Sequence, residues 1–179
     1  MTQCRVLALA FLVLPLAACG GKSPAVEDVR PRTIVLDWVE FARSDGTPVL
    51  ELRVRRVHLS GSGWRVWASV RNVSRVSFTL KRPGGVAGTL GRGRNWTWFG
   101  LTELSAPGVG TRISHAEKYS PPLPRVLAPK RTWSGVFAGP AFSTTDRTIG
   151  VTFGFFVPER RLPGLPESFG WLTDHSFRT

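Results

Sequence analysis

From residue 32 onward, apolar and polar residues alternate along most of the chain with a period of two. In Trp64–Asn72, one face of an extended chain would carry Trp64, Val66, Ala68 and Val70, and the other Arg65, Trp67, Ser69 and Arg71. This alternation is typical of a β-strand with one buried face. The same period recurs in Val49–Leu59 and in Arg147–Val157, with hardly a helical window between them. The pattern therefore predicts strands in all three segments.

The alternation changes parity within Val49–Leu59. Leu50, Leu52 and Val54 follow one parity, whereas Val57 and Leu59 follow the other. A β-bulge that absorbs one extra residue at Arg55–Arg56 would keep all five side chains on the same face, so we expect a bulge there.

In Arg147–Val157 the pattern predicts a single buried face, formed by Ile149, Val151, Phe153, Phe155 and Val157. Gly150 and Gly154 fall on the opposite face. Glycines at such positions indicate a close neighbour or a bend.

The segments between and around these strands complete the prediction. Further strands are expected at Thr33–Phe41, Val76–Leu80, Asn95–Leu101 and Trp133–Phe137, while Ile113–Tyr119 is ambiguous. Turns are expected at Ser44–Gly46 and Ser60–Gly63, a long glycine-rich loop at 83–93, and a proline-rich extended connector at 120–129. The tail beyond Pro158 is broken by Pro and Gly, and its Phe169, Trp171 and Leu172 are expected to fold back onto the domain. About seven or eight antiparallel strands predict an all-β fold, a single β-sandwich over residues 32–179.

The first residues follow a different pattern. Arg5 gives a positive start, Val6–Leu14 is an uninterrupted apolar run, and the small residues of Pro15–Gly20 close it. This order predicts a secretory signal peptide over residues 1–18. The apolar run is shorter than the roughly 20 residues that a transmembrane helix needs. Residues 19–31 mix Gly, Ser, Pro and charge without periodicity, and they predict a flexible tether.

The cleavage region Leu16-Ala17-Ala18-Cys19 resembles the lipobox of bacterial lipoprotein precursors. The resemblance implies cleavage before Cys19, lipidation of Cys19 by fatty-acyl chains, and attachment to the extracytoplasmic face of the cell membrane or the outer membrane. Gly20 and Gly21, in place of an Asp that would favour inner-membrane retention, permit the outer membrane. The alternative is an ordinary signal peptide whose cleavage site includes a Cys. Besides Cys19 the chain has only Cys4, inside the signal, so the mature chain cannot form an intrachain disulfide.

A second resemblance lies in Gly63–Ser74, where a hydrophobic strand runs into Asn72-Val73-Ser74. This segment resembles the immunoglobulin-like domains of secreted bacterial lipoproteins. Because the Cys pair of antibody domains is absent, the likeness is to disulfide-free members. Such domains are typically non-enzymatic, which is an analogy at the level of the fold.

The chain is strongly basic, with 24 Lys and Arg against 12 Asp and Glu and a net charge of +12. Removal of the signal takes away Arg5 and no acid. Outside a cell, such a charge attracts anionic wall polymers, phospholipid headgroups and acidic proteins. The alternative is that the excess of Arg over Lys reflects base composition.

The outer side of the predicted second hairpin is the first candidate binding surface. Arg53 and Arg55 would project from one strand, and Arg65 and Arg71 from the next, with Trp67 between them. Like charges on neighbouring strands destabilise a sheet, so something should offset them: cation–π contact with Trp67, acidic side chains or an anionic ligand. The surface is either a solvated arginine face or a platform for an anion or glycan.

The glycine-rich loop is the second candidate, with Arg82, Arg92, Arg94, Trp96 and Trp98 in and beside it. Glycines let backbone N–H groups approach an anion, but no Gly-Lys-Ser/Thr follows, so this is not a P-loop. An ordinary long loop is the alternative. Basic residues beside aromatics can also bind single-stranded nucleic acid, but no nucleic acid is expected as a partner of an extracytoplasmic protein.

Catalytic and metal-binding patterns are not found in the sequence. His58, His115 and His175 lack the spacing of metal ligands, and no segment resembles a nucleophile elbow. No cofactor, metal or catalytic residue is predicted. We therefore expect a lipid-anchored, non-catalytic binding or scaffolding protein of the bacterial envelope that contacts a partner protein through its basic, Trp-bearing surface. The alternatives are a binder of an anionic wall polymer or glycan, and an envelope hydrolase.

Overall fold

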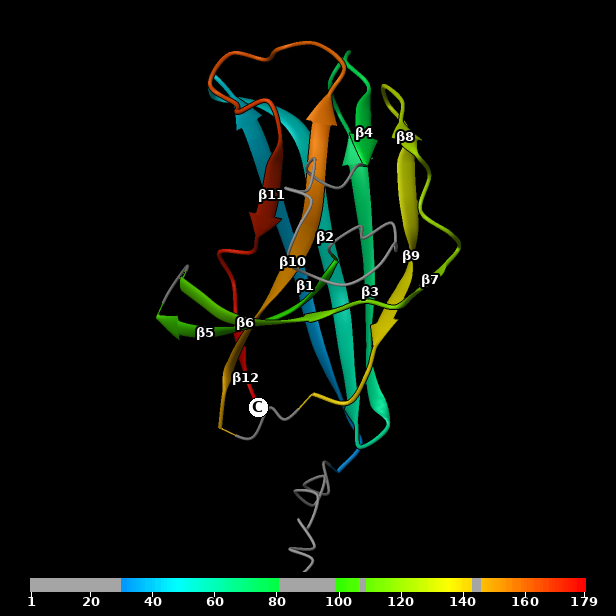
Figure 1. The fold of residues 1–179 in the computed structure, drawn as a ribbon, viewed down its shortest axis with the longest axis vertical. Helices are drawn as coiled ribbons and strands as arrows, with labels where there is room; N and C mark the ends of the chain where they lie inside the picture. Colours follow the sequence, from blue (N-terminus) through cyan, green and yellow to red (C-terminus); the bar gives the residue numbers. More distant parts are fainter. Residues whose placement is uncertain (1–29, 81–98, 107–108, 143–145) are drawn as a thin grey trace, which may run out of the picture.

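The computed structural model describes residues 30–80, 99–106, 109–142 and 146–179. These residues fold into two antiparallel β-sheets (Figure 1). The five-stranded sheet contains, in spatial order, β1 (Arg32–Ser44), β2 (Thr47–Ser60), β3 (Gly63–Asn72), β9 (Thr132–Gly139) and β7 (Lys118–Ser120). The second sheet has the order β6 (Val109–His115), β5 (Gly100–Ala106), β10 (Thr148–Pro158), β4 (Phe78–Leu80) and β8 (Val126–Leu127). The short strands β11 (Phe169–Leu172) and β12 (Phe177–Arg178) pair with β10.

The prediction of an all-β sandwich is confirmed, but the expected number of seven or eight strands is too low. The structure has twelve strands in its described residues. The additional ones are short: β7 and β8 lie within or beside the proline-rich connector, and β11 and β12 lie in the tail. Such strands are hard to find in the sequence because only two to four residues pair in each, too few for an alternating pattern. The prolines and glycines near them also favour a prediction of loop.

The first hairpin turns as its sequence predicts. Asp45 and Gly46 connect β1 to β2, and their φ angles are +44° and +77°. Two successive positive φ angles define a type I′ turn, whose twist matches that of the strands it joins, and Asp-Gly is a preferred pair for it.

The predicted bulge in β2 is also present. The register with β3 shifts between Val54 and Arg56, so Val54 pairs with Ala68 while Arg56 pairs with Trp67. Arg55 is the extra residue. As a result the five apolar side chains on either side of the bulge are all buried in the core: Leu50, Leu52, Val54, Val57 and Leu59.

The predicted buried face of β10 is wrong at its C-terminal end. Ile149, Val151 and Phe153 are buried as expected, but the next buried aromatic residue is Phe156 rather than Phe155. Pairing with β11 is irregular between Phe153 and Phe156, and this irregularity changes the parity of the strand. Phe155 and Val157 are therefore only half-buried. Gly150 does face a close neighbour, since an added Cβ would lie 3.1 Å from Leu172 Cδ1 of β11.

Aromatic side chains from both sheets pack between them. Phe99 lies at the centre, with ring centroids 5.0 Å from Phe153 of β10 and 5.3 Å from Phe137 of β9. Trp64 of β3 is fully buried, and its Nε1 donates a hydrogen bond of 2.8 Å to Ser114 Oγ of β6. The inner face of the five-stranded sheet is thus covered, whereas its outer face is the surface on which the predicted arginines lie.

Candidate functional site

The outer face of the five-stranded sheet brings together most of the predicted basic surface. Residues that pair directly on adjacent strands share a face. On β2 and β3 the pairs are Glu51 with Arg71, Arg53 with Ser69, Arg56 with Trp67, and His58 with Arg65. Arg53, Arg65, Trp67 and Arg71 therefore lie on one face, as the sequence predicted.

The bulge changes which arginine contacts Trp67. Arg55 is exposed at the bulge and has no partner in the β2–β3 register. Arg56 takes the position opposite Trp67, and its guanidinium carbon lies 4.3 Å from the centroid of the indole ring. This distance is that of a cation–π contact. Sequence reasoning missed Arg56, although the parity change that predicted the bulge also predicts that Arg56 faces outward.

Two of the arginines are balanced by one acidic side chain. The Glu51 carboxylate is nearly buried; it accepts a hydrogen bond from Arg53 Nε and lies 3.9 Å from Arg71 Nη1. Glu51 thus offsets part of the positive charge on this face, and the Arg56–Trp67 contact supplies the cation–π interaction that was the other expected means. In contrast, neither Arg65 nor Lys118 forms an ion pair with any residue that the structure describes.

The half of the outer face formed by β1 and β2 is apolar as well as basic. Val35 pairs with Arg56 and Val39 pairs with Arg53, so each valine lies beside an arginine. Val35 is 70% exposed and Val39 is 39% exposed. We call this half, formed by Val35, Val39, Arg53, Arg55 and Arg56, the flat half.

The half formed by β3, β9 and β7 is hollowed. An open cavity of about 570 Å³ is lined by Trp67 of β3, Tyr119 of β7, and Val136 and Ala138 of β9, among others. A second cavity of about 440 Å³ lies beside it and includes the β2–β3 turn and the end of β9. Both are lined by Arg65, Lys118 and Ala138. We call the two cavities together the groove.

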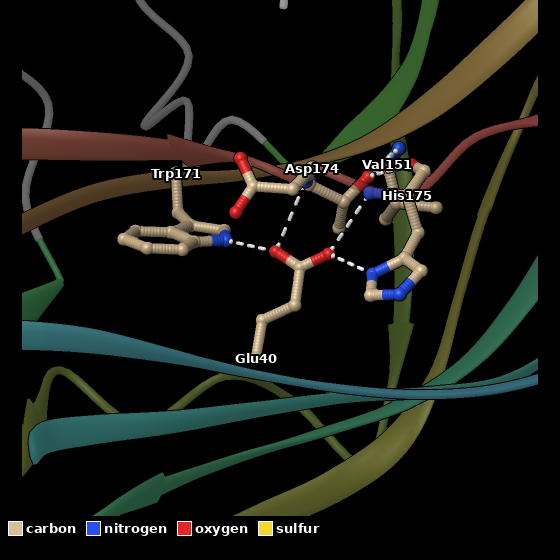
Figure 2. A network of polar contacts seen from close by, with 6 residues as sticks. Glu40, Val151, Trp171, Asp174 and His175 are labelled. Carbon is tan, nitrogen blue, oxygen red and sulfur yellow. Dashed lines mark hydrogen bonds and ion pairs between the residues drawn. The ribbon is translucent and has the colours of Figure 1, made fainter.

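Glu40 forms a polar cluster that the sequence did not predict (Figure 2). It lies on the inner side of β1 and is 7% exposed. Its Oε2 accepts hydrogen bonds from Trp171 Nε1 at 2.7 Å and from the Asp174 N–H at 3.1 Å. Its Oε1 accepts one from the His175 N–H at 3.1 Å and lies 2.8 Å from His175 Nδ1. Because both oxygens are occupied by the protein's own tail, this carboxylate fastens the tail to β1.

Asn72 forms a second buried polar centre. Its Nδ2 donates hydrogen bonds to Val76 O at 2.7 Å and Leu127 O at 2.9 Å. Its Oδ1 accepts hydrogen bonds from the Ser74 N–H at 3.0 Å and from Ser74 Oγ at 2.8 Å. The Asn-Val-Ser segment that resembled other lipoproteins therefore has a structural role here, as the joint between β3 and the second sheet.

The histidines lie in three separate environments. Burial lowers the pKa of His115 below its usual value, which favours the neutral ring. His58 Nδ1 is 2.9 Å from Thr33 Oγ1, and His175 stacks on Trp38 with ring centroids 5.5 Å apart. Burial also raises the pKa of Tyr119, mainly by desolvation, and so keeps its hydroxyl protonated. Within the described part of the chain, no three His, Cys, Asp or Glu side chains are grouped so that they could hold a metal ion.

Several predicted sites lie outside the described residues. They are Cys19, with the signal peptide and tether before residue 30, and the loop residues Arg82, Arg92, Arg94, Trp96 and Trp98. In the described ranges no helix is long and apolar enough to cross a membrane.

No protein-family model matches the chain, and neither a curated protein nor a solved structure is significantly similar to it.

Proposed function

We propose that this chain is a lipid-anchored, non-catalytic binding protein of the bacterial cell envelope. The anchor is Cys19, and the domain is held on the extracytoplasmic face of the membrane. The domain contacts a partner protein through the outer face of its five-stranded sheet.

The flat half is the observation that carries this proposal. Exposed apolar side chains on a soluble surface are most often isolated, but here two valines and three arginines lie on adjacent strands. Exposed apolar side chains beside arginines are the composition that protein interfaces favour, since Arg is enriched there and Lys and Glu are depleted. The partner surface should be apolar with an acidic rim.

Capture from detergent-solubilised envelope, at low and high salt, tests the proposal with the full chain as bait. We expect one stoichiometric partner that stays bound in high salt, because apolar contacts are not screened. Val35→Glu should abolish its capture. Val126→Glu is the matched control, since Val126 is 49% exposed on β8 in the other sheet.

Equal capture by both variants would show that the flat half is not the interface. The lipid anchor is tested on the same envelope fraction before detergent is added. Wild-type protein should sediment with membranes, and Cys19→Ser should not; if both variants sediment equally, Cys19 is not the anchor.

A binder of an anionic wall polymer or glycan is the second candidate function. The specific observation that favours it is the groove, with its two cations that have no acidic partner among the described residues.

A further inference from the structure

The groove contains a pair of cations held apart by a small residue. Arg65 of β3 and Lys118 of β7 both pair with Ala138 of β9, so the three residues form one row across adjacent strands. Neighbouring strands are about 4.8 Å apart, which places the backbones of Arg65 and Lys118 about 10 Å from each other. Between them only the Ala138 methyl group rises from the sheet. The row leaves room for one anionic group that both cations can reach.

The next row across the same strands is aromatic and apolar. Trp67 pairs with Val136, which pairs with Ser120, and Trp67, Val136 and Ser120 all line the larger cavity. Arg56 lies over the indole from the β2 side, which helps to hold the ring in place. A fixed indole beside a shallow apolar floor offers a surface on which the apolar C–H face of a ligand ring can pack.

On the other side of the cation row the groove is polar. The smaller cavity is lined by Ser60, Ser62 and His58. The Ser60 hydroxyl donates to Gly63 O and can accept from a ligand, while Ser62 Oγ and the His58 ring can exchange hydrogen bonds with a ligand rich in hydroxyl groups. Glu117 also lines this cavity, and its carboxylate disfavours a second anion there. The ligand unit in this cavity should therefore be polar and uncharged.

We infer that the groove binds an acidic saccharide in which charged and neutral sugars alternate. Its anionic group lies between Arg65 and Lys118, one sugar ring packs beside Trp67 over Val136, and the neighbouring neutral sugar occupies the cavity of Ser60 and Ser62. This inference deepens the second candidate function. It uses the groove and does not depend on the flat half.

Titration calorimetry of the detergent-solubilised full chain tests the assignment. Hyaluronan octasaccharide is the probe, because its carboxylates occur on every second sugar. Lys118→Gln should weaken binding about 10-fold, as expected for loss of one charge-assisted contact. Ala138→Glu should abolish binding by placing a carboxylate between the two cations. Arg131→Gln is the matched control: it removes an exposed charge next to the β9 residue Thr132, at the opposite end of the strand from Gly139, and should leave binding within twofold.

Two further ligands separate the contributions of charge and sugar. A neutral chitin oligosaccharide should bind at least 10-fold more weakly than hyaluronan. Polyphosphate of equal charge should also bind more weakly, because it cannot pack beside Trp67. If polyphosphate binds as tightly and in the same Lys118-dependent way, the site recognises anions alone and the saccharide assignment is wrong. If hyaluronan binding is unchanged in Lys118→Gln and Ala138→Glu, the groove is not the site.

The results can also be separated from those of the protein-partner proposal. If the wild-type chain does not bind the saccharide but still captures a partner in a Val35-dependent way, only the groove assignment is wrong. Lys118-dependent saccharide binding without partner capture would overturn only the protein partner.

Discussion

At the residue scale, Asn72 shows how a polar side chain can stabilise a sandwich from within. It is completely buried at the end of β3, and all of its hydrogen-bonding groups have partners. Its amide joins β3 to two other segments: the β3–β4 connection, at Ser74 and Val76, and β8 at Leu127. Burial of such an amide lowers the stability of the fold little while every hydrogen-bond partner is present. When one partner is removed, the unpaired group keeps its full desolvation penalty and the free energy of unfolding falls.

Asn72→Ala should therefore lower the free energy of unfolding by about 2–4 kcal/mol. It removes the Nδ2 donor from the Leu127 and Val76 carbonyls, and of these only Val76 O keeps another side-chain donor, Ser74 Oγ. Urea unfolding measures the change. Ser74→Ala is the graded comparison, since the Ser74 N–H still donates to Asn72 Oδ1 in that variant. It should be clearly less destabilising than Asn72→Ala. Equal decreases in the free energy of unfolding would mean that the Ser74 hydroxyl, rather than the Asn72 amide, makes the stabilising contacts between β3 and the second sheet.

At the element scale, β2 accommodates one extra residue in a bulge. The strand presents Leu50, Leu52 and Val54 to the core before the bulge and Val57 and Leu59 after it. Because side chains alternate with a period of two, the extra residue Arg55 would turn Val57 and Leu59 out of the core in a regular strand, and the bulge keeps them on the inner face. The same bulge sets Arg56 opposite Trp67 and so determines the boundary between the flat half and the groove.

Deletion of Arg55 should leave the protein folded, because it makes Val54 and Arg56 consecutive and all five apolar side chains then follow one regular alternation toward the core. Any loss of stability should come from the pairing with β1, whose register shifts at the same place. Far-ultraviolet circular dichroism and urea unfolding are the measurements. Arg55→Ala keeps the bulge and loses only an exposed side chain. It should change stability by no more than about 0.5 kcal/mol. An unfolded deletion variant would contradict this account of the bulge.

At the scale of the whole molecule, the C-terminal tail connects the two sheets. The tail pairs with β10 of the second sheet through β11 and β12, and residues Trp171 to His175 bond to Glu40 of β1 in the first sheet. Trp38 of β1 packs against the tail, with ring centroids 5.5 Å from His175 and 6.2 Å from Phe177. The tail thus closes the side of the sandwich at β1, where the five-stranded sheet ends.

Glu40→Gln should loosen this closure. The substitution removes the charge and presents an NH₂ group where an oxygen now accepts hydrogen bonds, so stability should fall by about 2 kcal/mol. Hydrogen exchange should accelerate at the Asp174 and His175 amides and remain slow in β2 and β3. Glu167→Gln, at an exposed position in the tail, is the control and should change neither property. If the exchange rates of Asp174 and His175 do not change, Glu40 does not fasten the tail.

The sequence alone determined that most segments form β-strands, that the chain turns at Asp45 and Gly46, and that β2 bulges at Arg55. These features depend on neighbours within a few residues, and a period of two records them directly. The tertiary structure decided the features that join distant segments. Arg65 and Lys118 become neighbours of Ala138 only because β9 pairs with both β3 and β7. Glu40 and the tail meet only because both sheets pack around one core. No local pattern encodes such pairings, because the contact energies that select them arise between segments that the chain brings together only on folding.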